Sequence, residues 1–170
     1  MTPTRRDSGG PRDYPAMARA AAPLASLADR TAQLEGVVDV LWRGLSSSGL
    51  SWVGFYLDQP GEPEDARLVL GPRHPKPACS PIGLHGVCGQ SLRGRCVRIV
   101  SDVSELGPDY IACDPRDRSE IVIPILDRAA DGSPHCWAVL DLDSHEVGCF
   151  DQADALGLQD VLRAAGVTRV

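Results

Sequence analysis

Three cysteines stand in segments that are typical of loops or loop–helix junctions: KPAC ending at Cys79, GVCG around Cys88 and IACD around Cys113. A cysteine acts as a nucleophile only as its thiolate. We expect Cys88 to lie near a helix N-terminus, whose free N–H groups favour an anion. Asp114, in contrast, disfavours a thiolate at Cys113. The alternative for each cysteine is a small buried hydrophobic side chain.

Three carboxylates stand in or beside apolar runs that predict strands. Asp141 and Asp143 are two residues apart in one run and therefore share a face of the strand. Glu120 opens another apolar run, shortly after the segment of Cys113. Neighbouring carboxylates repel one another unless a cation or a proton arrives, so these acids could hold an ammonium group or act as a proton source. The alternatives are a solvated strand face for the aspartates and an edge or capping position for Glu120.

Two aromatic side chains could line a pocket beside these groups. Trp52 and Tyr56 lie in the apolar run 51–57, where alternation predicts a strand with both aromatic rings and Gly54 on one face. Packing in the core is the alternative for both rings.

The other cysteines are expected to be structural and not to bind metal. They are Cys96, Cys136 and Cys149, and alternation places Cys136 on the apolar face of its strand with Ala138 and Leu140. No two cysteines have the spacing Cys-x2-Cys, and the four histidines do not gather near them. The sequence therefore predicts no zinc site.

Charge and hydropathy exclude several classes of partner. A net charge of −6 without a basic cluster argues against nucleic acid and anionic membranes. No apolar run approaches the roughly 20 residues of a membrane span. Arg5-Arg6 could indicate twin-arginine export, but charged residues interrupt the region that follows. We therefore expect a cytoplasmic protein with reduced thiols.

Hydrophobic patterning predicts the elements that carry these residues. Residues 1–16 are rich in Pro, Gly, Arg and Asp and are expected to form a disordered arm, with 17–170 as one domain. Apolar residues at helical spacing, Leu27 among them, predict a helix over 24–46. The other predicted elements are strands at 51–57, 66–70, 97–100, 120–126 and 136–143, helices at 87–93 and 151–165, and irregular loops at 71–86 and 101–118. This order predicts an α+β fold whose antiparallel sheet carries the N- and C-terminal helices on one side.

Seven segments together resemble the free methionine-(R)-sulfoxide reductase family of GAF domains. In the family's order they are SWVGFYL (51–57), LVLGP to KPAC (68–79), GVCG (86–89), IVSDV (99–103), IACD (111–114), RSEIVIPI (118–125) and VLDLDS (139–144). The resemblance covers about residues 30–165. It implies a single GAF domain that reduces free methionine-(R)-sulfoxide without a bound cofactor. It also implies a homodimer and recycling by thioredoxin or another external dithiol.

The resemblance assigns roles to residues by position. Cys113 corresponds to the attacking thiol, Cys79 to the thiol that resolves the oxidised intermediate and Cys88 to an auxiliary thiol. The residues that correspond to the family's substrate-holding and proton-donating acids are Glu120, Asp141 and Asp143, and those that line its pocket are Trp52 and Tyr56. These residue types suit the chemistry, because a sulfoxide oxygen leaves only after protonation. The thiolate attacks the sulfoxide sulfur, which yields methionine and a sulfenic acid on the attacking cysteine. A second thiol then condenses with the sulfenic acid to form a disulfide.

Two departures from the family's pattern bear on these roles. The loop between Cys79 and Cys88 is one residue shorter and carries His85 where the pattern has Lys, and Tyr110 precedes the IACD segment where the pattern has His. Neither departure removes a residue with an assigned role. Two alternative functions stay open: a non-catalytic GAF module that binds a small ligand, and a redox sensor that forms a disulfide without turnover.

Overall fold

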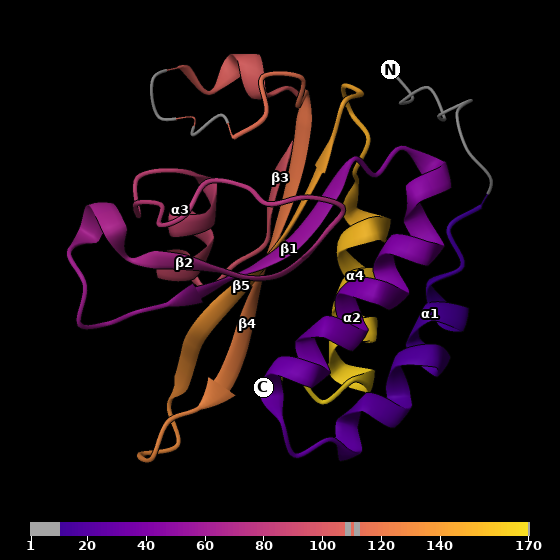
Figure 1. The fold of residues 1–170 in the computed structure, drawn as a ribbon, viewed down its shortest axis with the longest axis vertical. Coiled ribbons are helices and arrows are strands. Elements are labelled where there is room, and N and C mark those ends of the chain that lie inside the picture. The colour runs from indigo at the N-terminus through magenta and orange to yellow at the C-terminus, as the bar shows by residue number, and fades with distance from the viewer. Residues whose placement is uncertain (1–10, 108–109, 111–112, 170) are drawn as a thin grey trace.

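A computed structural model of the chain describes residues 11–107, 110 and 113–169. In these residues one sheet of five strands has the order β2-β1-β5-β4-β3, and every neighbouring pair is antiparallel. The strands are β1 Trp52–Asp58, β2 Leu68–His74, β3 Arg98–Val100, β4 Ser119–Arg128 and β5 Pro134–Ser144. The structure thus confirms the predicted α+β fold with an antiparallel sheet (Figure 1).

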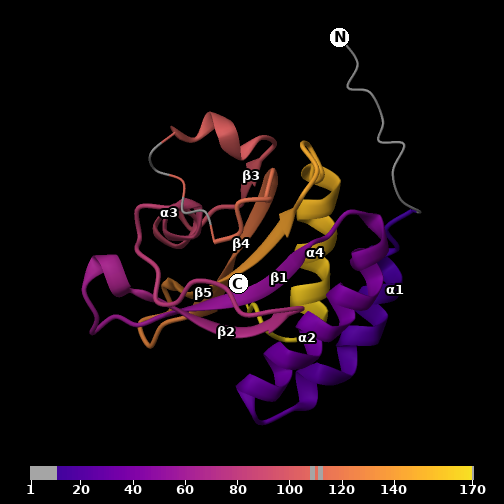
Figure 2. The ribbon, with the colours of Figure 1, turned by 45° about the horizontal axis from the view of Figure 1, so that its top comes forward.

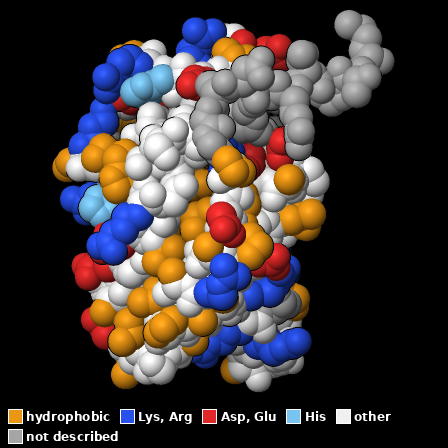
Figure 3. All heavy atoms as spheres, turned by 90° about the vertical axis from the view of Figure 1, so that its right-hand side faces the viewer, with side chains coloured by type: hydrophobic (Ala, Val, Ile, Leu, Met, Phe, Trp, Pro, Cys, Tyr) orange, Lys and Arg blue, Asp and Glu red, His pale blue; other side chains and the backbone are white. Residues whose placement is uncertain are grey.

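The helices divide between the two faces of this sheet. They are α1 Tyr14–Ala21, α2 Arg30–Leu45, α3 Val87–Gly94 and α4 Gln152–Ala164. Helices α1, α2 and α4 lie together on one face, as predicted for the terminal helices, while α3 and the long connections lie on the other (Figures 1 and 2). From the side of α1, the surface intersperses acidic, basic and apolar side chains (Figure 3). No helix in the described part of the chain is long and apolar enough to cross a membrane.

Alternation along the strands divides the apolar side chains between two cores. Val53 and Phe55 of β1 pack toward the terminal helices with Leu41 of α2 in the larger core. Trp52 and Tyr56 of the same strand belong to a smaller core on the side of α3. The predicted division of this strand between two faces is therefore confirmed. The larger core packs one face of the sheet against the terminal helices, and the face on the side of α3 is available for a site.

The expectation of a disordered arm over 1–16 is wrong for residues 12–16, while residues 1–10 lie outside the described residues. Helix α1 begins at Tyr14, directly after its N-cap Asp13. Arg12 forms an ion pair with Asp154 of α4 at 2.7 Å, and Tyr14 Oη donates a hydrogen bond to the same carboxylate at 2.8 Å. Composition could not reveal these contacts, because their partner lies near the other end of the sequence.

The predicted helix over 24–46 begins later than expected. Ala22–Ser26 form a 3₁₀ helix, and α2 starts directly after Asp29, whose carboxylate accepts a hydrogen bond from Thr31 N at 3.0 Å. Leu27, which the helical spacing placed on the apolar stripe, lies between the two helices and is 42% exposed.

The connections on the α3 side differ in part from the prediction. Strand β2 continues through Pro72 to His74, beyond the predicted strand 66–70, because an edge strand with a β-bulge tolerates proline. The loop expected over 71–86 therefore begins at residue 75. In the loop expected over 101–118, Val103–Glu105 form a 3₁₀ helix, and residues 108–109 and 111–112 lie outside the described residues.

Candidate active site

The three predicted acids come from β4 and from β5, the central strand of the sheet. In the register of these strands, Glu120 lies directly opposite Asp143, and Asp141 lies opposite Val122. On the other side of β5, Trp52 of β1 pairs with Asp143. Residues that pair across an antiparallel sheet point to the same face. The acids and the indole ring therefore meet on the face that carries α3.

These side chains line one pocket that encloses about 450 Å³ of space between protein atoms, part of it open to solvent. The predicted site residues in its wall are Trp52, Tyr56, Cys88, Cys113, Glu120, Asp141 and Asp143. The eighth predicted residue, Cys79, is exposed, and its carbonyl accepts a hydrogen bond from Tyr56 Oη at 2.9 Å. The fold thus brings all eight residues together. Among the described residues that line the pocket there is no Lys, Arg or His.

Cys113 is half-buried, and its side chain lies beside that of Cys79. Burial is the main reason that its pKa rises to about 12, and the contact with the Cys79 side chain acts in the same direction. The side chain of Tyr56 acts in the opposite direction. All six cysteines are free thiols. Cys113 therefore holds its proton and has a second thiol next to it.

Cys88 lies at the N-terminus of α3, as predicted, and is 5% exposed. Burial, and after it the carboxylate of Asp141, raises the pKa of the thiol well above its ordinary value. The expectation that the helix N-terminus favours a thiolate here is wrong, because desolvation and the neighbouring acids outweigh the helix dipole.

Burial also raises the pKa of each of the three acids, and a neighbouring acid adds to the effect in each case. For Glu120 this neighbouring acid is Asp143, for Asp141 it is Glu120, and for Asp143 it is Asp141. Oδ1 of Asp141 is buried and has no hydrogen-bond partner among the described residues. Such a cluster keeps protons at a pH at which ordinary carboxyl groups are ionised, or it attracts a cation.

Two pocket residues also hold the segment that carries Cys79. Trp52 Nε1 donates a hydrogen bond to the carbonyl of Lys76 at 2.9 Å, and Tyr56 Oη donates to the carbonyl of Cys79. The Lys76 ammonium group in turn forms an ion pair with Asp114. The segments on either side of the contacting thiols are therefore tied to each other and to β1.

Asp114 does not act on Cys113 as the sequence suggested. Arg116 and Lys76 both donate hydrogen bonds to its carboxylate, and they hold its pKa below the ordinary value. Because two cations offset this negative charge, the expected penalty on a Cys113 thiolate is reduced.

Asp117 also belongs to the site, although it was not predicted from the sequence. It lines the pocket, is 6% exposed, and lies 3.6 Å from His145 Nε2. Burial raises its pKa. The only sequence signal is an acid close to Cys113 in a polar segment, which is weak. Tyr110, one of the departures from the family's pattern, also lines the pocket.

The remaining cysteines lie away from the pocket wall. Cys96 is exposed, whereas Cys136 and Cys149 are buried. Cys136 is not on the face of Ala138, as alternation predicted, but in the smaller core. A β-bulge near this point, where Cys136 pairs with Leu126 and Ala138 with Ile125, moves the side chain to the other face.

Comparison with known proteins gives clear relatives, although no protein-family model matches the chain. The Escherichia coli protein named free methionine-R-sulfoxide reductase is 36% identical over 155 residues, which cover 89% of this chain and 81% of that protein. The Saccharomyces cerevisiae protein of the same name is 36% identical over 124 residues, 71% of this chain and 65% of the yeast protein, just under two thirds.

Solved structures that are similar to this chain include a protein of the same name. The structure of free methionine-R-sulfoxide reductase from Neisseria meningitidis in complex with its substrate superposes with a TM-score of 0.73 at 33% identity, over 96% of this chain and 94% of that chain. Other neighbours are described as a GAF domain and as a putative GAF sensor protein.

Proposed function

Because the chain belongs to the free methionine-R-sulfoxide reductase family of GAF-domain proteins, we propose that it reduces free methionine-(R)-sulfoxide to methionine. Cys113 is the attacking thiol, and thioredoxin or another external dithiol is the reductant. The observation that carries the proposal is the convergence of this thiol, three acids of raised pKa and two aromatic rings on one pocket.

The acids account for a preference for the free amino acid. A free amino acid carries an ammonium group, which a methionine residue within a peptide lacks. Glu120, Asp141 and Asp143 offer negative charge, and no cationic side chain among the described residues of the pocket competes for it. Trp52 and Tyr56, with ring centroids 6.2 Å apart, offer apolar walls for the thioether end of the substrate.

The same acids can supply the proton that the reaction needs. Sulfoxide oxygen is a poor leaving group until it is protonated. A carboxyl group of raised pKa keeps its proton at a pH at which ordinary carboxyl groups are ionised, and it can donate this proton. The substrate's ammonium group favours ionisation of the acid that it touches, so one acid binds the ammonium group while another keeps the proton.

The thiols then complete the reaction in two steps. Cys113 loses its thiol proton and its Sγ attacks the sulfur of the protonated sulfoxide; the hydroxyl group then moves from that sulfur to Sγ as the new S–S bond breaks, so that methionine leaves and Cys113 becomes a sulfenic acid. Cys79, already in contact with Cys113, attacks the sulfenic sulfur, so that a disulfide and one water molecule form. Because Cys79 is exposed, an external dithiol can reach this disulfide and reduce it by exchange. Cys88 is an auxiliary thiol.

The test is NADPH oxidation coupled through thioredoxin and thioredoxin reductase. The substrates are free methionine-(R)-sulfoxide, the free (S) epimer and a peptide-bound sulfoxide, with Cys113→Ser in parallel and Cys96→Ser as a control at an exposed cysteine. We expect consumption only with the free (R) epimer, lost in Cys113→Ser and kept in Cys96→Ser. No NADPH consumption with any sulfoxide, together with no methionine formed when dithiothreitol replaces thioredoxin, would refute the proposal.

A redox sensor is the second candidate, because the contact between the Cys79 and Cys113 thiols would also serve a reversible disulfide. A sensor forms this disulfide with peroxide but releases no methionine from methionine sulfoxide. Methionine measured after one turnover of the reduced protein, without any reductant, therefore separates the two functions. The homodimer expected from the resemblance stays a prediction, and light scattering after size-exclusion chromatography would test it.

A further inference from the structure

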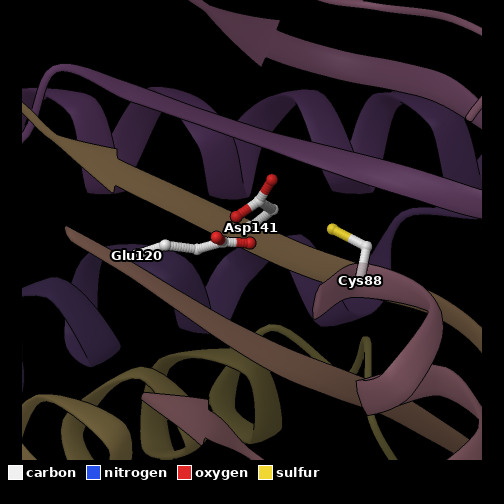
Figure 4. A group of neighbouring side chains, drawn as sticks. All are labelled: Cys88, Glu120 and Asp141. Atoms are coloured by element: carbon white, nitrogen blue, oxygen red, sulfur yellow. The ribbon is translucent and has the colours of Figure 1, made fainter. Parts of the chain in front are cut away.

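Cys88, Glu120 and Asp141 converge from three different elements, α3, β4 and β5 (Figure 4). Each residue is more than nine-tenths buried. One donor atom from each, Sγ of the cysteine and an oxygen of each carboxylate, lies within 4.8 Å of the other two. In Figure 4 the thiol points toward the carboxylate of Asp141, and the Glu120 carboxylate lies beside it.

One oxygen of the Asp141 carboxylate lacks a hydrogen-bond partner among the described residues, while the Cys88 thiol interacts with the group. This oxygen, Oδ1, is buried, and buried polar atoms in native proteins are normally bonded. No described residue in the pocket wall is cationic, so a cation must come from outside. A substrate ammonium group would use the two acids but gains little from a thiol. Thiolate sulfur and carboxylate oxygen are instead both ligands that Zn²⁺ takes in proteins.

We propose that Cys88, Glu120 and Asp141 form a binding site for Zn²⁺ or a similarly soft divalent cation, which binds the reduced protein and excludes the substrate. Zn²⁺ takes thiolate sulfur at about 2.3 Å and carboxylate oxygen at about 2.0–2.2 Å in a tetrahedron. The three donors reach this geometry by small side-chain rotations, because they already lie within 4.8 Å of one another. Mg²⁺ and Ca²⁺ require oxygen ligands and fit this set poorly.

Binding of the metal displaces the thiol proton of Cys88 to solvent. Three protein ligands leave the fourth tetrahedral position open to the pocket, where water completes the coordination. The metal then occupies the acids that would hold the substrate's ammonium group. The site would therefore inhibit the proposed reaction, but the metal binding itself does not depend on that reaction.

A second group of possible ligands serves as an internal comparison. Asp114, Asp117 and His145 also have donor atoms within 4.8 Å of one another. Basic side chains already pair with Asp114, and His145 lies beside Asp117. Because these carboxylates have partners within the protein, they need a metal ion less than Asp141 does.

The test is titration of the reduced full chain with Co²⁺ and with Zn²⁺. Wild type is compared with a Cys79→Ser/Cys113→Ser variant, in which the contacting thiols cannot hold metal. Thiolate-bound Co²⁺ gives a sulfur-to-metal charge-transfer band, and calorimetry gives the affinity and stoichiometry for Zn²⁺. We expect one ion per chain and the band in both proteins. Cys88→Ser should abolish the band, and Asp141→Asn should weaken Zn²⁺ binding about tenfold or more, while Asp114→Asn should change neither.

Absence of the band, or its survival in Cys88→Ser, would overturn the proposal. If Cys88→Ser does not fold, Asp141→Asn decides, because it keeps the thiol, and unchanged Zn²⁺ affinity there would also overturn the proposal. Free methionine should weaken Zn²⁺ binding by competition. The titration needs no turnover, so an inactive protein that binds metal would refute the proposed function alone. An active protein that binds no metal would refute the metal site alone.

Discussion

Replacement of Asp141 by asparagine should stabilise the fold while it damages the site. The side chain is 7% exposed, and its Oδ1 has no hydrogen-bond partner among the described residues. No cationic side chain lies in the described wall of the pocket, so the charge is offset only in part, by the Cys88 side chain, when the group ionises beside Glu120. Asparagine keeps the shape, removes the charge and adds donors for the neighbouring acids.

The expected gain follows from the cost of an unpaired buried polar group, about 1–3 kcal/mol. Burial, and after it Glu120, raises the pKa of Asp141, so the folded state binds this proton more tightly than the unfolded chain, in which aspartate titrates near about pH 3.9. The wild-type carboxyl therefore costs stability increasingly as pH rises above about 4 toward the folded pKa. The advantage of the variant should be smaller at pH 5 than at pH 8, where it corresponds to about 2–12 °C in Tm.

The assay is calorimetric unfolding of Asp141→Asn and wild type at pH 5 and pH 8, with Asp65→Asn as the control. Asp65 is exposed, so its replacement should change stability by less than about 0.5 kcal/mol at either pH. A variant that is no more stable than wild type at pH 8, or whose advantage does not grow with pH, would refute the reasoning. Activity with methionine-(R)-sulfoxide should fall sharply in Asp141→Asn and persist in Asp65→Asn.

Three further substitutions test other parts of the structure. Arg12→Met should cost about 1.5–3 kcal/mol, because it removes a charge-assisted contact between Arg12 and Asp154; thermal unfolding equal to that of the exposed Arg19→Met would contradict this. Cys79→Ser should release one methionine per chain and then stop as a sulfenic acid that dimedone traps for mass spectrometry, whereas sustained turnover with thioredoxin would argue against its resolving role. Tyr56→Phe removes a hydrogen bond worth about 0.5–1.5 kcal/mol from the Cys79 carbonyl. It should slow disulfide formation about two- to tenfold, which rapid-quench thiol titration would detect.

The elements of the sheet could be predicted because alternation acts locally. Trp52 and Tyr56 share a face, as do Asp141 and Asp143, since successive strand residues point to opposite sides. The predictions from the sequence are wrong where a contact with a distant residue or an irregularity in a strand overrides the local pattern. Arg12 is ordered by a carboxylate at the other end of the sequence. Cys136 changes face because a β-bulge interrupts the alternation.

The residues of the site could be nominated from their types and family context, but their juxtaposition could not. That Glu120 faces Asp143 follows from the register of β4 and β5, which depends on packing over the whole sheet. The prediction of no zinc site considered only cysteines and histidines close together in the sequence. The group of Cys88, Glu120 and Asp141 exists only because α3 folds over the two central strands.

The cluster of three acids explains why different kinds of cation, one at a time, would bind in the same pocket. A rigid sheet holds the three carboxyl groups close together and buried, so the fold cannot relax to separate them, and the described wall offers no cationic side chain. Protons, a substrate ammonium group and a divalent metal are then three ways to neutralise the same oxygens, and each excludes the others. A ligand that binds only the folded state also stabilises it, by an amount that depends on its concentration relative to Kd. Methionine and Zn²⁺ should therefore both raise the Tm of wild type, and both should raise it less in Asp141→Asn, in which part of the repulsion is already gone.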